Sequence, residues 1–257
     1  MNNVSTILVP FDFSESAKRA LNYTVDYIGD SDIKIILVYI TNEQSITKEE
    51  AFNVLREKYT RNLKVPIEWV LGSNSLIDTI IKVQKGKKAD MIFMGTSGST
   101  DNVGATNTSK LVLAVDCPVI VVPKNVDACT IKNISLILGI NEIDDTSVLG
   151  TLLEVSKRFN AKVHVLTIQN SPGTYGYSKA DEKNENALMY YLEKFYAEHT
   201  FIENTDIVEG VFSYVDNHNI DMIAILPRNH TQKSAPSEGL LTKELALRSL
   251  VPILAIN

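Results

Sequence analysis

The 257-residue sequence has few of the residues that build disulfide scaffolds or clustered metal sites. It contains two cysteines, Cys117 and Cys129, which do not form a CxxC pair, and four histidines without HExxH or other ligand spacing. A small disulfide-rich fold needs several paired cysteines, and a cysteine-rich zinc centre needs closely spaced ones. The sequence therefore excludes both, and it predicts no metal site.

Long apolar runs are also absent. No stretch reaches the roughly 18 consecutive apolar residues of a membrane-spanning helix. The first apolar run is too short for the hydrophobic region of a signal peptide. The net charge of −6 gives no general attraction to nucleic acid or to an anionic membrane. We therefore expect a cytoplasmic protein with neither nucleic acid nor a membrane as its partner.

Four apolar segments of the first half recur in the second half, in the same order and at nearly constant spacing. Each is short, rich in Val, Ile and Leu, and nearly continuous rather than alternating. This pattern is typical of parallel strands that are buried on both faces. The paired segments are 6–9 with 135–138, 34–40 with 162–168, 90–94 with 221–225, and 118–122 with 252–256.

Helical patterns lie between these segments. Ser14 and Ser75 each precede apolar residues at helical spacing, where a serine is a good N-cap. Thr146 or Ser147 precedes another such pattern, and a longer helical stretch is expected around 181–199. Alternation of strands and helices predicts right-handed crossovers and an open parallel sheet with helices on both faces.

The repeat divides the chain into two tandem α/β domains, which we place at 1–126 and 127–257. The polar segment 124–130 bridges a strand and the start of the second copy. Segment 171–178, with its Ser, Pro and Gly residues, is expected to be a flexible loop inside the second domain.

Candidate ligand-binding residues follow the predicted strands of the first domain. Open parallel sheets bind ligands beyond the carboxyl ends of their strands, where the strand order switches. Glycines there allow close approach of the backbone, and amides and hydroxyls at a helix start suit phosphate. The candidates are Pro10, Asp12, Val38, Gly95, Gly98, Ala105, Thr106 and Asn107.

Several of these candidates also have a purely structural explanation. Gly95 and Gly98 can serve a tight turn, Thr106 can cap a helix, and Asp12 can orient the first turn of the helix that follows it. The residue pattern alone leaves these two interpretations open.

Several catalytic and nucleotide motifs are missing. The sequence has no GxGxxG, no GxxxxGK[ST] and no GxSxG. A dinucleotide fingerprint, a P-loop and a hydrolase nucleophile elbow are therefore not supported. We predict no catalytic residues and no enzymatic activity.

Three segments of the first half resemble the universal stress protein family. Residues 7–17, ILVPFDFSESA, are similar to its first strand and helix start. Residues 89–98, ADMIFMGTSG, are similar to its fourth strand and glycine turn, and residues 117–123, CPVIVVP, to its last strand. The second half resembles a divergent copy of the same domain.

The resemblance implies a five-stranded parallel sheet in each domain, Rossmann-like and similar to adenine nucleotide alpha hydrolases. It also implies pairing of the two domains with each other, or of two chains in a homodimer, through the last strand. Many members bind ATP, so ATP with Mg²⁺ is the implied cofactor. By position, Asp12 would lie near the ribose and phosphates, and the backbone of Val38 would meet the adenine. Gly95, Gly98 and the turn 105–107 would hold the phosphates.

The sequence departs from the family motif G-x2-G-x9-G at one point in the first half. Only six residues, 99–104, separate Gly98 from Ala105, which stands at the position of the third glycine. In the second half, Asn141 stands at the Asp12 position and Leu226-Pro227 begin the segment that replaces the glycine turn. We therefore expect the second domain to bind no nucleotide.

Two other functions compete with a nucleotide-binding stress protein. One is an interaction or scaffold module that acts through dimerisation and binds no nucleotide. The other is an ATP pyrophosphatase, a class that carries a Ser-Gly-Gly-x-Asp loop after its first strand. This chain has Pro10-Phe11-Asp12-Phe13-Ser14 there, so the sequence does not favour that enzyme.

Overall fold

A computed structural model describes residues 4–40, 48–60, 63–73, 75–97, 106–139, 141–143, 145–170, 177–227 and 239–257. The chain divides into two compact units, Asn2–Cys129 and Thr130–Asn257. This division lies three residues beyond the border that we placed after residue 126.

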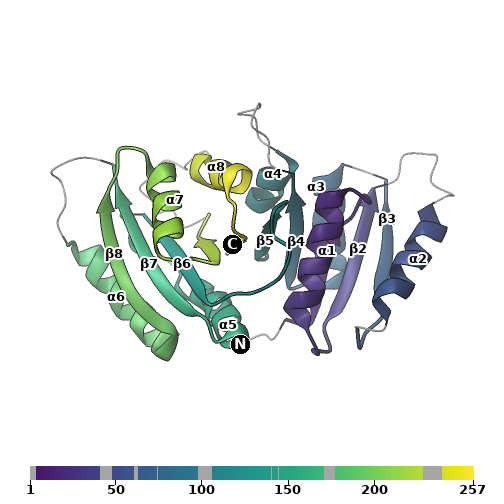
Figure 1. Ribbon diagram of the computed structural model, residues 1–257, viewed down its shortest axis with the longest axis horizontal. Coiled ribbons are helices and arrows are strands. Elements are labelled where there is room, and N and C mark those ends of the chain that lie inside the picture. The colour runs from purple at the N-terminus through teal and green to yellow at the C-terminus, as the bar shows by residue number, and fades with distance from the viewer. Residues whose placement is uncertain are drawn as a thin grey trace. The chain divides into compact units, whose positions relative to one another are not determined.

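The described residues of the first unit form a five-stranded sheet with the order β3-β2-β1-β4-β5. All of its strand pairs are parallel. Helix α1 packs on β4 and β5, and α3 packs on β1 and β2 from the opposite face (Figure 1). The elements are β1 Thr6–Pro10, α1 Glu15–Ile28, β2 Lys34–Ile40, α2 Lys48–Thr60, β3 Glu68–Gly72, α3 Leu76–Lys87, β4 Met91–Thr96, α4 Asn107–Ala114 and β5 Val119–Pro123.

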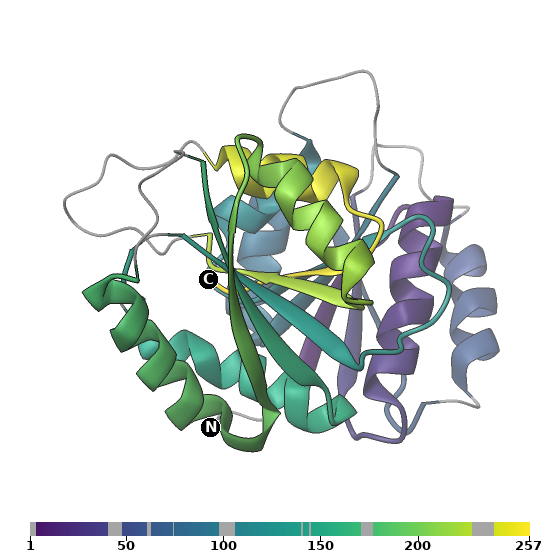
Figure 2. The same ribbon diagram turned by 60° about the vertical axis from the view of Figure 1, so that its left-hand side comes forward.

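The described residues of the second unit repeat this arrangement, with the parallel order β8-β7-β6-β9-β10. Figure 2 shows α5 and α6 on one face of the strands and α7 and α8 on the other. The elements are β6 Asn133–Leu138, the 3₁₀ turn η2 Thr146–Val148, α5 Leu149–Phe159, β7 Lys162–Gln169, α6 Lys179–Leu192, the 3₁₀ turn η3 Glu193–Phe195, β8 Tyr196–Glu203, α7 Ile207–Asn217, β9 Met222–Ile225, α8 Leu240–Arg248 and β10 Ile253–Ala255. The predicted fold class is confirmed.

An aspartate before the fourth strand of each unit fastens the start of the first strand. Asp90 Oδ2 accepts hydrogen bonds from the backbone N–H groups of Ser5 (2.8 Å) and Thr6 (2.9 Å). Asp221 Oδ2 accepts from the N–H groups of Lys132 (2.8 Å) and Asn133 (2.9 Å). The repeat seen in the sequence therefore extends to a matching polar contact in both units.

Two predicted helix starts are confirmed, and one predicted helix is too long. Ser14 and Ser75 cap α1 and α3 through their side chains. The helix expected around 181–199 ends at Leu192, and β8 begins at Tyr196. Glu193, at the end of the helix, has a left-handed backbone (φ 48°), which breaks helical continuity.

Helix α5 begins differently from the prediction. The 3₁₀ turn η2 precedes α5, and the side chain of Asp145, rather than Thr146 or Ser147, caps that turn. Most of the loop predicted at 171–178 lies outside the described residues. None of the described helices is long and apolar enough to cross a membrane.

Candidate functional site

The candidate site lies where the strand order of the first sheet reverses. Strand β1 has β2 on one side and β4 on the other, which is the switch point of an open parallel sheet. Pro10 ends β1 and pairs in register with Val38 of β2. Asp12 follows β1 by two residues, and Gly95 is the penultimate residue of β4. The fold therefore brings these four candidates to the carboxyl edge of the sheet.

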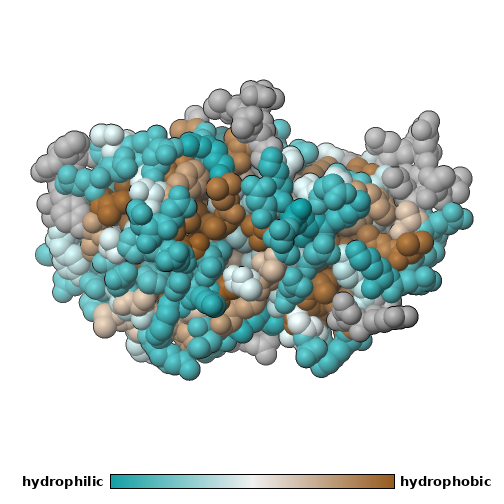
Figure 3. Space-filling view, viewed as in Figure 1, coloured by the Kyte–Doolittle hydropathy of each residue, from teal (hydrophilic) through white to brown (hydrophobic). Residues whose placement is uncertain are grey.

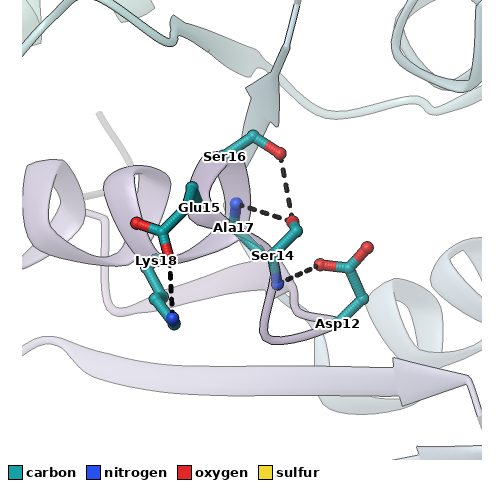
Figure 4. Close-up of polar contacts among 6 residues, drawn as sticks. All are labelled: Asp12, Ser14, Glu15, Ser16, Ala17 and Lys18. Atoms are coloured by element: carbon teal, nitrogen blue, oxygen red, sulfur yellow. Dashed lines mark hydrogen bonds and ion pairs between the residues drawn. The ribbon is translucent and has the colours of Figure 1, made fainter.

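The turn after β1 is held by short-range hydrogen bonds (Figure 4). Asp12 is exposed, and its Oδ1 accepts from the Ser14 N–H (2.9 Å). Ser14 Oγ in turn accepts from the Ala17 N–H (3.2 Å) and lies 3.1 Å from Ser16 Oγ. Within the described residues, the second carboxylate oxygen of Asp12 takes part in no hydrogen bond. A fixed turn thus presents one free anionic oxygen at the switch point.

Phe13 holds the same turn from the apolar side. Its backbone is left-handed (φ 66°), an unusual conformation for a residue with a large side chain. Its ring makes edge contacts with Phe11 (5.0 Å between centroids), Tyr39 (5.9 Å) and Trp69 (5.9 Å). Trp69 is also stacked on Phe52 at 4.5 Å. These five residues form an aromatic cluster that compensates for the strained backbone of Phe13.

The residue pattern along the chain does not predict this aromatic cluster. Its members come from four separate parts of the chain, namely the turn after β1, the end of β2, helix α2 and strand β3. Tyr39 and Trp69 lie on neighbouring strands, with a stacked geometry at 5.4 Å. The signal in the sequence was weak, since aromatic residues near strand ends are common in cores.

Val38 is almost fully buried, and its carbonyl already has a partner. The carbonyl accepts from the Phe11 N–H at 2.9 Å, which continues the ladder between β1 and β2. A ligand base would therefore meet a Val38 backbone whose position is set by the sheet.

Gly95 has a structural reason to be glycine. A β-carbon at this position would lie 2.1 Å from the Ser16 carbonyl oxygen and 2.5 Å from its carbon. No side chain fits at such distances, because both atoms belong to the backbone of α1. The packing of α1 on β4 therefore requires this glycine with or without a ligand.

The start of α4 combines capping with hydroxyl groups. Thr106 caps the helix by accepting from the Ser109 N–H (3.2 Å), and Ser109 Oγ donates to the Thr106 carbonyl (3.1 Å). Asn107 is the first residue of the helix, where backbone N–H groups are not used inside the helix. Gly98 and Ala105 lie outside the described residues.

Comparison with known proteins identifies this half of the chain. Residues 3–123 match the model of the Universal stress protein family. The first half of the chain belongs to this family. The match covers the three segments on which the resemblance rested, and the sheet order β3-β2-β1-β4-β5 with its switch-point site lies inside it.

Solved structures show the fold of the whole chain. A universal stress protein from Archaeoglobus fulgidus DSM 4304 superposes with a TM-score of 0.73 at 16% identity, over 100% of this chain and 99% of that one. A protein from Pseudomonas aeruginosa UCBPP-PA14, also described as a universal stress protein, gives 0.69 at 15% identity over 99% and 93%. At these identities the likeness shows the fold and no more.

The same fold occurs in another setting. The cytoplasmic domain of a prokaryotic cation chloride cotransporter superposes with a TM-score of 0.59 at 9% identity, over 98% of this chain and 95% of that one. Among curated proteins no sequence matches this chain. The fold alone therefore does not decide the function.

The first two cations that follow Asp12 along the chain, Lys18 and Arg19, are engaged with other residues. Lys18 Nζ donates to Glu15 at 2.7 Å (Figure 4). Arg19 pairs with Asp127 and donates to the Val126 carbonyl at 3.4 Å. Within the described residues, no group of three His, Cys, Asp or Glu side chains could hold a metal ion.

Cys117 is not a reactive thiol. Burial, as the largest cause, raises the pKa of its thiol to about 12. A thiol with this pKa stays protonated near neutral pH, whereas the thiolate is the nucleophile.

The second unit fastens the equivalent turn differently. The side chain of Asn184 is buried, and its Nδ2 donates to the Asn141 carbonyl (3.0 Å). Its Oδ1 accepts from the Ile143 N–H (2.8 Å). Helix α6 thus holds the loop after β6, at the position where the first unit carries Asp12.

Proposed function

We propose that the first unit binds an adenine nucleotide, with ATP as the leading candidate, and holds it without turnover. The observation that carries the proposal is the free carboxylate oxygen of Asp12, presented by a fixed turn at the switch point between β1 and β4. This is the place where open parallel sheets bind ligands. A carboxylate there suits the hydroxyl groups of a ribose, which donate hydrogen bonds.

The remaining parts of a nucleotide also find suitable groups. The first N–H groups of α4, beside Thr106 and Asn107, suit phosphate oxygens because the helix dipole favours negative charge there. The rings of Phe13 and Tyr39 are half-buried, so each keeps a surface against which a base can pack. Mg²⁺ is then held by the ATP phosphates and water, since the one free oxygen of Asp12 accepts from the ribose.

The absence of turnover rests on the charges near the site. Phosphoryl transfer needs cations that stabilise the charge of the transition state. Lys18 pairs with Glu15, and Arg19 pairs with Asp127. Neither of these two cations is then available to clamp the phosphates of a nucleotide at Asp12, which favours binding without turnover.

Nucleotide binding is tested by thermal unfolding of the full chain with millimolar ATP and Mg²⁺. The chain has one tryptophan, Trp69, so its fluorescence follows the first unit. ATP should raise the melting temperature of this transition, since a ligand that binds only the folded state stabilises it. Loss of one charge-assisted hydrogen bond in Asp12→Asn should weaken binding about tenfold. No shift with the unmodified protein would refute the proposal.

Asp30→Asn is the matched control. Asp30 is exposed and follows α1, so it lies at the opposite, amino edge of the sheet, and its substitution makes the same change in charge. This variant should retain the full shift. Incubation of the protein with ATP should release no phosphate above the buffer rate, and steady release would overturn the claim of binding without turnover.

A second candidate function is a protein-interaction module. Strand β3 lies at the edge of its sheet and exposes 56% of Leu71. Such an edge can pair with another chain. Light scattering should then give a dimer mass that Leu71→Lys reduces to the monomer, and a monomeric unmodified protein would exclude this form of dimer.

A further inference from the structure

A cavity of about 250 Å³ opens at the carboxyl edge of the second sheet. Its walls are the ends of β6, β7 and β9 and the first turns of α7 and α8. Figure 3 shows hydrophobic side chains at the surface where α7 and α8 lie in Figure 1. The cavity thus lies at the same edge of its sheet as the nucleotide site proposed for the first unit.

The described residues that line this cavity are uncharged and mostly apolar. None of the twelve described residues that line it is ionisable. Isoleucine and leucine side chains form most of the wall, among them Ile137, Ile168, Ile207, Ile225 and Leu241. A phosphate or carboxylate would lose its hydration here without gaining an opposite charge. The lining therefore selects against a nucleotide.

Two polar residues in the lining can orient a bound ligand. Asn141 and the buried Thr242 belong to its lining, and their amide and hydroxyl groups can exchange hydrogen bonds with one polar edge of a ligand. Ligand sites of this kind combine an apolar wall with a few polar groups that set orientation. The cavity has this composition.

A glycine leaves the cavity open toward the end of β6. A β-carbon at Gly139 would meet no atom within 4 Å. Unlike Gly95, Gly139 is therefore not required by packing against a neighbouring helix. Its missing side chain is space that a ligand can use.

We propose that the second unit binds a neutral, compact organic molecule of about two fused rings, with one hydrogen-bonding edge. The size follows from the volume, since a dry cavity of about 150 Å³ accommodates benzene. The neutrality follows from the uncharged lining, and the single polar edge from Asn141 and Thr242. Indole has these properties and serves as the probe.

Calorimetric titration of indole into the full chain tests the proposal. The expected result is saturable binding of one indole per chain. Gly139→Leu places a side chain in the cavity and should weaken binding about tenfold or more, because the ligand would have to displace it. Indole-3-carboxylate, which adds a charge to the same rings, should bind about tenfold more weakly.

Gly150→Leu is the matched control. Gly150 lies in α5, outside the cavity, and a β-carbon there also meets no atom within 4 Å. This variant should bind indole like the unmodified protein. Absence of saturable binding, equal binding by Gly139→Leu, or equal affinity for the charged analogue would each overturn the proposal. Asp12→Asn should leave indole binding unchanged, so this result is separate from that of the nucleotide test.

Discussion

The α-carbon of Gly95 lies so close to the carbonyl of Ser16 that an added β-carbon would come within 2.1 Å of the oxygen. The contact joins β4 to the first turn of α1. Because Ser16 follows the Asp12 turn, the glycine fixes the helix that carries the candidate site. A glycine that resembles part of a phosphate motif therefore also has a packing role.

Replacement of Gly95 by alanine should destabilise the first unit. The new methyl group cannot avoid the backbone of α1 unless the helix moves, and overpacking of this kind costs about 3 kcal/mol. Urea denaturation followed by Trp69 fluorescence should show the midpoint falling accordingly.

Gly86→Ala provides the control. Gly86 lies within α3, and a β-carbon there meets no atom within 4 Å. Alanine is the better helix former by about 1 kcal/mol, so this variant should be more stable than the unmodified protein. If Gly95→Ala and Gly86→Ala changed the free energy of unfolding in the same direction, the contact with Ser16 would not explain why residue 95 is glycine.

Asp90→Ala and Asp221→Ala should each destabilise the unit in which they lie. Each removes a carboxylate oxygen that accepts two backbone hydrogen bonds from the first strand of its unit. Charged hydrogen bonds of this kind are worth about 1–3 kcal/mol. In urea denaturation, Asp90→Ala should lower the midpoint reported by Trp69 fluorescence. An unchanged Trp69 midpoint in Asp90→Ala would show that these bonds contribute nothing to stability.

Two substitutions of Phe13 separate the effect of its backbone conformation on stability from the effect of its ring contacts. Phe13→Ala removes the contacts with Tyr39 and Trp69 but keeps a β-carbon on a left-handed backbone. Phe13→Gly removes the same contacts and relieves the backbone, a difference of about 1 kcal/mol. Both should destabilise the first unit in urea denaturation, with Phe13→Gly the more stable of the two. If Phe13→Ala were the more stable of the two variants, that result would contradict a left-handed backbone at residue 13.

His199 should make the second unit less stable in acid. Burial lowers the pKa of His199 below its usual value of 6.5, while Glu185 and Asp181 act against this shift to a smaller extent. Nε2 lies 2.9 Å from Thr167 Oγ1, and Nδ1 has no hydrogen-bond partner in the described part of the chain. The folded state therefore takes up a proton at lower pH than the unfolded state does.

The expected pH dependence follows from this direction. As the pH falls below about 6.5, the unfolded state gains the proton first, so stability declines until the pH reaches the lower folded pKa. Scanning calorimetry between pH 7.5 and 5.5 should show a smaller decline in His199→Gln than in the unmodified protein. Equal declines would show that His199 is not the group responsible.

The sequence predicted the inner strands well and the outer strands poorly. β1, β4, β6 and β9 are buried on both faces, so they appear as continuous runs of apolar residues. β3 and β8 lie at the edges of their sheets, and their residues are half-buried or exposed rather than buried. The helix expected around 181–199 therefore extends wrongly into the start of β8, because an edge strand of mixed residues lacks that signature.

The candidate site was predictable in part. The carboxyl ends of parallel strands lie at the same edge of a sheet. Asp12 follows β1 and Gly95 lies near the end of the neighbouring β4, so both can be placed at that edge from the sequence. The order of the strands does not predict the conformation of Phe13, whose left-handed backbone depends on rings from β2 and β3. The turn geometry therefore required the positions of distant side chains.

The sequence by itself determined the α/β class, the internal repeat and the start of the main helices, because these depend on local patterns of apolar and capping residues. Only the tertiary structure decided why Gly95 must be glycine while Gly139 opens into a cavity. Both glycines stand near the ends of buried strands and look alike in the sequence. They differ because a helix backbone covers one and empty space adjoins the other, and such neighbours come from parts of the chain far apart in sequence.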